Sequence, residues 1–425
     1  MNLRLIFVAL LLGATQALES YNGYKVIEMS LKTDEEIKHV LQISEKYQAD
    51  IWKGPSKITT THVMLSPEYF DGFIESLTKY EIQYKIMINN VQKIIDEETG
   101  MNENVKFMKS FSATRPTIND HFADYEEIMD WINYLTVKYS FVSSGSYGKS
   151  YEGRDLRYVK ISTGQNRKAV LVEGGIHSRE WLATSTVTYI IEKMISNILT
   201  NNSRIVSLLS KFDVYFIPVF NPDGNVYSHL HGNRLWRKNR RPFPLDGRTC
   251  FGVDLNRNFD AQFGVAGTSS NPCDDLYRGP NAFSEPETKH FSIFVKKLGL
   301  NLSLFFSLHA YAQFWFVPYG FGFSRPVDDL ELRRVANIGN QALYEVNHER
   351  FYIGSPPELL YAAAGGSFDW VKMKARVKYA YTLELRPSRY NVRGSSGFIA
   401  PISDISKSGE EVYAGFIATI QAISL

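Results

Sequence analysis

Apolar and polar residues follow two different patterns along this chain, and the first occupies residues 24–95. Apolar runs at 24–29, 60–65 and 82–88 have the length and bounding residues of short strands. Amphipathic stretches between them have helical spacing: one covers 34–47 and opens at Thr33, and the other begins at Ser66 and Pro67. The elements fit the order strand, helix, strand, strand, helix, strand. This order predicts a small ferredoxin-like α+β domain.

The second pattern begins near residue 118 and is built on a larger scale. Buried apolar runs predict core strands at 169–172, 212–219, 302–308 and 379–383. Long helical patterns cover 125–139, 184–199, 286–298, 328–348 and 405–423. Strands that alternate with helices predict an α/β domain whose mainly parallel sheet has helices on both faces. Between the two patterns, residues 97–115 are polar and show no clear period, which indicates an interdomain linker.

Three of the predicted strands end in residues that can bind or activate a metal. His177 and Glu180 follow the first strand, His309 ends the third, and Glu384 ends the fourth. Ligands of open α/β sheets bind outside the carboxyl ends of the strands, so these side chains are expected to converge there. Two histidines and a glutamate form a common catalytic zinc set, which leaves Glu384 free to take a proton from water. Taken singly, a histidine at a strand end is more often a hydrogen-bonded structural residue.

The motifs around these residues resemble those of the zinc metallocarboxypeptidases of the pancreatic carboxypeptidase A/B type. The matching segments are 175–181 (GIHSREW), 233–238 (NRLWRK), 252–259 (GVDLNRNF) and 361–370 (YAAAGGSFDW). The resemblance extends over nearly the whole chain. It implies a mixed eight-stranded sheet, an inhibitory propeptide in the first domain, one zinc ion per chain and hydrolysis of C-terminal peptide bonds.

The resemblance also implies roles for single residues. Arg237 takes the position that stabilises the oxyanion, and Asn256 and Arg257 take the positions that hold the substrate carboxylate. The remaining substrate-binding residues by resemblance are Arg179, Tyr311, the mobile Tyr361 and, at the base of the side-chain pocket, Phe368.

Phe368 bears no charge, so burying a charged substrate side chain against it would be costly. Aromatic or aliphatic C-terminal residues are therefore expected as products, in a digestive role. Two alternatives stay open. One is a basic-specific enzyme with an acidic residue elsewhere in the pocket, and the other is a catalytically silent binding protein.

Composition limits the kinds of binding partner and the cellular compartment that are expected. Hydrophobic residues make up 44% of the 425 positions and charged residues 22%, as in globular proteins, while the net charge of +2 suggests no nucleic-acid partner. Residues 1–17 have the pattern of a secretory signal and are too short to span a membrane. A secreted monomer is expected. Cys250 and Cys273 are then expected to form a disulfide, with two buried thiols as the alternative.

These signals divide the chain into a signal peptide (1–17), an activation propeptide with its linker (18–109) and a catalytic domain (110–425). A trypsin-like protease is expected to cleave after Lys109, because exposed linkers are where nicking concentrates. Lys106 is a second candidate, Pro116 hinders cleavage after Arg115, and a permanent tether is the alternative. Glycosylation sequons begin at Asn201 and Asn301.

Overall fold

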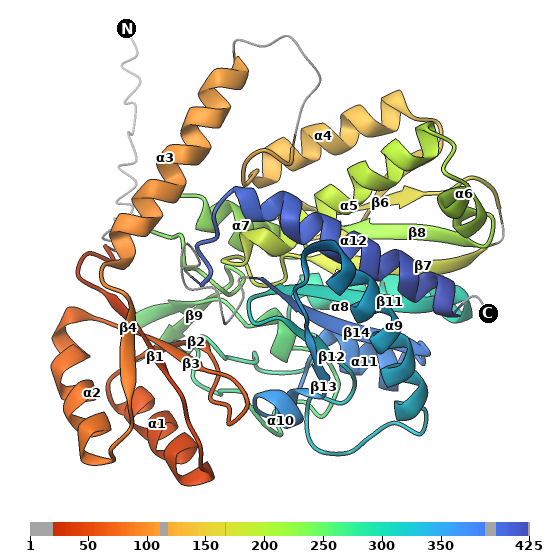
Figure 1. The fold of residues 1–425 in the computed structure, drawn as a ribbon. Coiled ribbons are helices and arrows are strands. Elements are labelled where there is room, and N and C mark those ends of the chain that lie inside the picture. The colour runs from red at the N-terminus through yellow and green to blue at the C-terminus, as the bar shows by residue number, and fades with distance from the viewer. Residues whose placement is uncertain (1–19, 111–117, 166, 387–396, 424–425) are drawn as a thin grey trace, which may run out of the picture.

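The first part of the chain forms the expected ferredoxin-like unit (Figure 1). The computed structural model describes residues 20–110, 118–165, 167–386 and 397–423. Within them, the strand order β2-β3-β1-β4 follows from the predicted succession of elements. The bounds are β1 Lys25–Met29, α1 Asp34–Lys46, β2 Asp50–Lys53, β3 Thr61–Leu65, α2 Pro67–Lys79 and β4 Tyr84–Ile88. Apolar side chains of β1 and β3 pack against those of both helices in a separate small core.

Most of the expected interdomain linker belongs to a helix that was not predicted, α3 (Val91–Ser110), which runs from the small domain toward α4 (Tyr125–Lys138) (Figure 1). Its buried side chains recur at helical spacing on one face, at Val91, Ile95, Glu98 and Asn102. Two of these four residues are polar, so the apolar residues alone show only a weak helical period. Both polar side chains form hydrogen bonds with the large domain: Glu98 with Arg234, and Asn102 Oδ1 with the backbone N–H of Phe122.

The second part of the chain contains the predicted eight-stranded sheet, in the order β13-β12-β14-β11-β7-β8-β6-β5. The four central strands β14, β11, β7 and β8 are parallel to one another, and their outer neighbours β12 and β6 run antiparallel to them. The bounds are β5 Val142–Lys149, β6 Asp155–Ile161, β7 Lys168–Gly174, β8 Phe212–Ile217, β11 Leu302–Ala310, β12 Phe314–Phe316, β13 Tyr352–Gly354 and β14 Tyr379–Leu385. Central strands buried on both faces explain why their sequences are continuous apolar runs.

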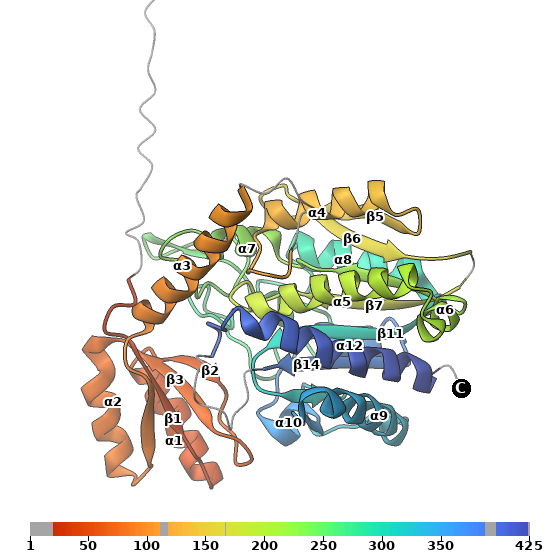
Figure 2. The same ribbon diagram turned by 45° about the horizontal axis from the view of Figure 1, so that its top comes forward.

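Helices cover both faces of this sheet (Figures 1 and 2). On one face, α4, α5, α9 and α12 share a core with the sheet, and α8 and α11 pack on the other. The bounds are α5 Trp181–Leu199, α6 Ser203–Leu209, α7 Pro222–Ser228, α8 Pro286–Leu298, α9 Asp329–Asn347, α10 Pro356–Leu359, α11 Ser367–Met373 and α12 Ser403–Ile423. No helix in the described ranges is long and apolar enough to cross a membrane.

The long connection between α7 and α8 is held by a hairpin and a disulfide. The hairpin consists of β9 (Pro242–Leu245) and β10 (Arg248–Phe251). The predicted disulfide joins Cys250 of β10 to Cys273, and no free thiol occurs among the described residues.

Some expectations fall outside the described residues, namely the signal peptide at 1–17 and the Arg115 bond. Lys109 lies in the last turn of α3.

Candidate active site

The sheet register brings the predicted chemical residues together at the carboxyl ends of three central strands. His309 on β11 lies beside Glu384 on β14 in the parallel pairing. His177 lies in the turn after β7, and Glu180 occupies the N-cap position of α5. The expected convergence of all four residues is therefore present in the structure.

His177, Glu180 and His309 form a compact buried cluster whose potential ligand atoms all lie within 4.8 Å of one another. Nδ1 of His177 lies 2.8 Å from Glu180 Oε1, and Nδ1 of His309 lies 3.1 Å from Glu180 Oε2. Both histidines thus turn the same ring nitrogen toward one point. Two imidazoles and one carboxylate converging on a point fit a catalytic zinc ion.

The far ring nitrogens of the two histidines have partners that fix which nitrogen faces the metal. His177 Nε2 lies 3.2 Å from Asp254 Oδ1, and His309 Nε2 lies 3.0 Å from the Ser307 hydroxyl. With Nε2 protonated and donating, Nδ1 keeps its lone pair for a metal. Such partners orient the imidazole ligands of metal sites.

Asp254 connects the cluster to the neighbouring cations. Its Oδ2 accepts hydrogen bonds from Arg237 Nε (3.1 Å) and Nη2 (2.7 Å), and its Oδ1 also accepts one from the backbone N–H of Asn256. Although burial opposes ionisation, Arg237 and Arg257 hold the pKa of Asp254 well below its usual value. Asp254 therefore both holds the His177 imidazole and caps the turn that begins at Leu255.

Glu384 lies next to the cluster without belonging to it. Burial raises the pKa of its carboxyl to about 7. A carboxyl group with a pKa in this range is suited to exchange protons near neutral pH.

The predicted carboxylate-binding residues lie on a short turn beside α11. Asn256 and Arg257 belong to the 3₁₀ turn Leu255–Arg257, and Asn256 Oδ1 accepts a hydrogen bond from the backbone N–H of Ser367 (2.9 Å). The next residue, Phe368, is buried in the first turn of α11. Tyr361 is more exposed and lies in the loop after α10.

The small domain contacts the predicted substrate-binding residues through side chains that the sequence did not identify. Asp50 on β2 accepts a hydrogen bond from Arg179 Nη1 (2.9 Å), and His62 Nδ1 on β3 lies 2.8 Å from the Tyr311 hydroxyl. Gly54 lies so close to Tyr361 that an added Cβ would be 2.2 Å from its ring. Three of the predicted substrate-binding residues are thus engaged by the small domain. The first domain shows no catalytic motif, so no sequence signal marked Asp50 or His62.

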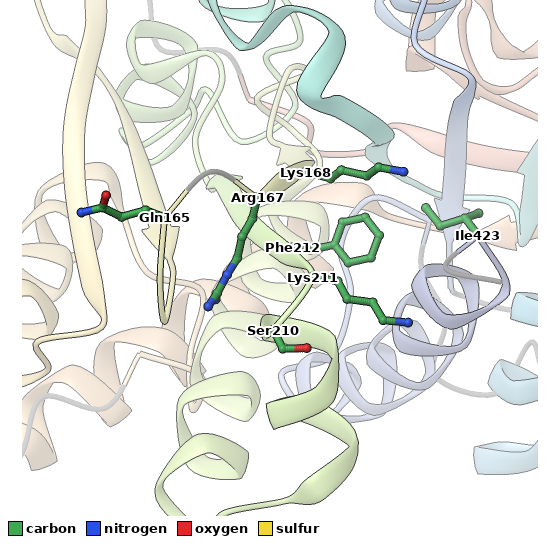
Figure 3. Close-up of a pocket in the computed structure, with 7 residues that line it drawn as sticks. All are labelled: Gln165, Arg167, Lys168, Ser210, Lys211, Phe212 and Ile423. Atoms are coloured by element: carbon green, nitrogen blue, oxygen red, sulfur yellow. The ribbon is translucent and has the colours of Figure 1, made fainter.

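A separate pocket lies at the amino-terminal ends of β7 and β8, away from the metal cluster at the carboxyl ends (Figure 3). Lys168 and Lys211 extend to the same side of it, whereas Arg167 hydrogen-bonds to the Thr163 hydroxyl and the Leu209 carbonyl. None of its seven lining residues is a histidine or a carboxylate, so it shares no chemistry with the cluster.

Comparisons with known proteins agree with this site. The zinc carboxypeptidase family model matches residues 128–415, and the carboxypeptidase activation peptide model matches residues 27–98. The chain is 35% identical to carboxypeptidase A1 of Bos taurus, over 98% of each chain. It is 39% identical to carboxypeptidase B of Astacus astacus, over 69% of this chain and 94% of that one.

A solved carboxypeptidase A from Helicoverpa armigera superposes with a TM-score of 0.86 at 28% identity, covering 95% of this chain and 98% of the other. Together with the buried His177, Glu180 and His309, these likenesses establish the class of enzyme and its metal. The chain belongs to the zinc carboxypeptidase family and carries that family's activation peptide.

Proposed function

We propose that this zinc carboxypeptidase zymogen is secreted and, once activated, releases aromatic or aliphatic C-terminal residues in a digestive role. The observation that carries the specificity is Phe368, a buried uncharged side chain on α11 next to the turn that holds Asn256. The signal pattern at residues 1–17 supports secretion, and we propose that the secreted protein is a monomer. Peptide and protein C-termini are the substrates.

The residues in and around the cluster have different roles in the reaction. Zinc held by His177, Glu180 and His309 supplies a Lewis acid and lowers the pKa of water. Glu384 takes the proton from the attacking water and returns it to the leaving amine. Its pKa near 7 matches both tasks.

Arginines bind the two charged parts of the substrate. Arg237 uses Nε and Nη2 on Asp254, which leaves Nη1 to face the developing oxyanion. Asn256 and Arg257 hold the terminal carboxylate, for which the planar guanidinium fork is suited. Tyr361 closes over it, and Arg179 and Tyr311 contact the residues that precede it.

The activation domain blocks these groups before cleavage. Asp50 presents a carboxylate to Arg179, as a substrate would, and His62 engages the Tyr311 hydroxyl. We place the activating cleavage by a trypsin-like protease after Lys109, at the end of α3.

Replacing Asp50 by asparagine should raise the activity of the uncleaved chain about tenfold, because a charge-assisted hydrogen bond to buried Arg179 becomes a neutral one. The measurement is hydrolysis of a small Phe-ended substrate before and after trypsin treatment. Asp34→Asn, which removes an exposed carboxylate paired with Lys57, is the matched control. Equal basal activity in both variants would contradict a blocking role for Asp50.

The test of the proposed function is release of C-terminal residues after trypsin treatment, with and without a zinc chelator. The substrate is an equimolar mixture of Phe-, Leu- and Arg-ended peptides. We expect chelator-sensitive release of Phe and Leu. Preferential release of Arg would instead favour the basic-specific alternative, and no release by a folded, cleaved and zinc-loaded chain would favour the silent binding protein.

A further inference from the structure

A fully buried glutamate, Glu173 on β7, lies one step below the metal cluster. The sheet register places it beside Ser307 on β11. Side chains two residues apart on a strand share a face, so Ser307 lies on the same face as the zinc ligand His309. Glu173, Ser307 and His309 therefore form a line that leads along this face of the sheet to the cluster.

Hydrogen bonds connect these three side chains in one direction. Ser307 Oγ donates to Glu173 Oε1 and lies 3.0 Å from His309 Nε2. A hydroxyl has one proton to donate, and Ser307 gives it to the carboxylate. Toward the histidine it can only accept, so the ring carries its proton on Nε2. Nδ1, which lies 3.1 Å from Glu180 Oε2, then keeps its lone pair for the metal.

A nearby amide favours the opposite tautomer of His309. Asn256 Nδ2 lies 3.4 Å from His309 Nε2, while its Oδ1 accepts a hydrogen bond from the backbone N–H of Ser367. The amide therefore turns a donor toward the ring and cannot accept the Nε2 proton. Without Ser307 as an acceptor, this donor would favour a lone pair on Nε2 and the proton on Nδ1, where it would block the metal.

Glu173 is itself held in place on both sides. Its second side-chain hydrogen-bond partner, besides Ser307, is the Ser367 hydroxyl on α11. A buried carboxylate is costly without such partners, so the two hydroxyls fix its position between the sheet and the helix. Both partners are neutral, whereas Asp254, which supports His177, is also paired with Arg237.

We propose that Glu173 is a positioning residue for the metal: through Ser307 it holds His309 in the orientation and tautomer that bind zinc. This Glu173–Ser307 relay serves His309 as Asp254 serves His177, with one hydroxyl inserted. Loss of such a partner of a ligating imidazole typically weakens metal binding about ten- to a hundredfold. The inference concerns zinc binding alone and does not depend on the proposed substrate preference.

The test measures the equilibrium affinity of the full-length, uncleaved chain for zinc, by competition with a chelator of known affinity. Glu173→Gln keeps the size of the side chain but removes its charge, and its NH₂ group can face Ser307 and reverse the hydrogen bond. We expect this variant to bind zinc about tenfold more weakly. Glu287→Gln, which changes an equally buried glutamate on α8, should leave the affinity near wild type.

A double-mutant cycle separates this role from a general structural one. Ser307→Ala breaks the relay, and we expect it also to weaken zinc binding about tenfold. In the Ser307→Ala background, Glu173→Gln should cause a further change of no more than about twofold, because the two residues act through one link. Independent losses that multiply to about a hundredfold would overturn the inference.

Unchanged zinc affinity in a folded Glu173→Gln chain would also overturn the inference. Should that variant fail to fold, Ser307→Ala decides, because it breaks the same link from the other side. Wild-type affinity in Ser307→Ala would overturn the inference, and the expected loss would support it. Failure of the proposed function looks different, because a chain that cleaves no peptide can still show all of these zinc affinities.

Discussion

Replacing Glu384 by glutamine should lower kcat by about a thousandfold while zinc remains bound. The amide preserves the shape of the side chain but cannot take a proton from water, and general acid–base catalysis contributes factors of this size. Glu384 lies beside His309 in the register but outside the three-residue cluster, so the metal should not be lost. The measurement is kcat on a Phe-ended peptide after trypsin activation, together with zinc per chain.

Glu411→Gln is the matched control, because burial also raises the pKa of Glu411 to about 7, yet this residue lies on α12. It should leave kcat near wild type. Loss of zinc in Glu384→Gln would show that Glu384 is a ligand instead of a base. Retention of full activity would show that another group moves the proton.

The fold was predictable in segments whose apolar residues follow a single strand or helix pattern. Strands β7, β11 and β14 are buried on both faces, and α8 begins and ends where its sequence pattern does. The helix in the polar segment that follows β4 was not predicted. There α3 packs Glu98 and Asn102 against the large domain, and such polar contacts depend on a distant Arg234 and Phe122 that no local pattern displays.

The site was predictable to the extent that its residues end strands or lie in recognisable motifs. His177, Glu180, His309 and Glu384 come together because parallel strands bring their carboxyl ends to one edge. Glu173 was overlooked because it is a single polar residue at the end of an apolar run. Ser307 on β11 links it by hydrogen bonds to His309, and this contact becomes visible only in the assembled sheet.

The contacts of the activation domain were beyond local sequence reasoning for a similar reason. Asp50 and His62 lie on ordinary-looking strands, and their partners Arg179 and Tyr311 are more than 100 positions away. The proposed blocking of the site therefore depends on where the docked domain places these two side chains.

Asp254 couples the metal cluster to Arg237, the residue proposed to bind the oxyanion. One carboxylate lies within hydrogen-bonding distance of the His177 ring through Oδ1 and pairs with Arg237 through Oδ2. Arg237 is thereby held at a fixed distance from the cluster, and a fixed donor needs little reorganisation as charge develops. Removing its guanidinium should therefore affect the transition state more than substrate binding.

Replacing Arg237 by methionine should lower kcat about a hundredfold, with a small change in KM, because the loss of one oxyanion donor costs this much. Arg237→Lys, which keeps the charge but not the fork on Asp254, should lie between methionine and wild type. Kinetics on a Phe-ended peptide after activation, with zinc content measured in parallel, separate the two effects. Added guanidinium ion should restore part of the kcat of Arg237→Met. A rise in KM at unchanged kcat would instead assign Arg237 to substrate binding alone.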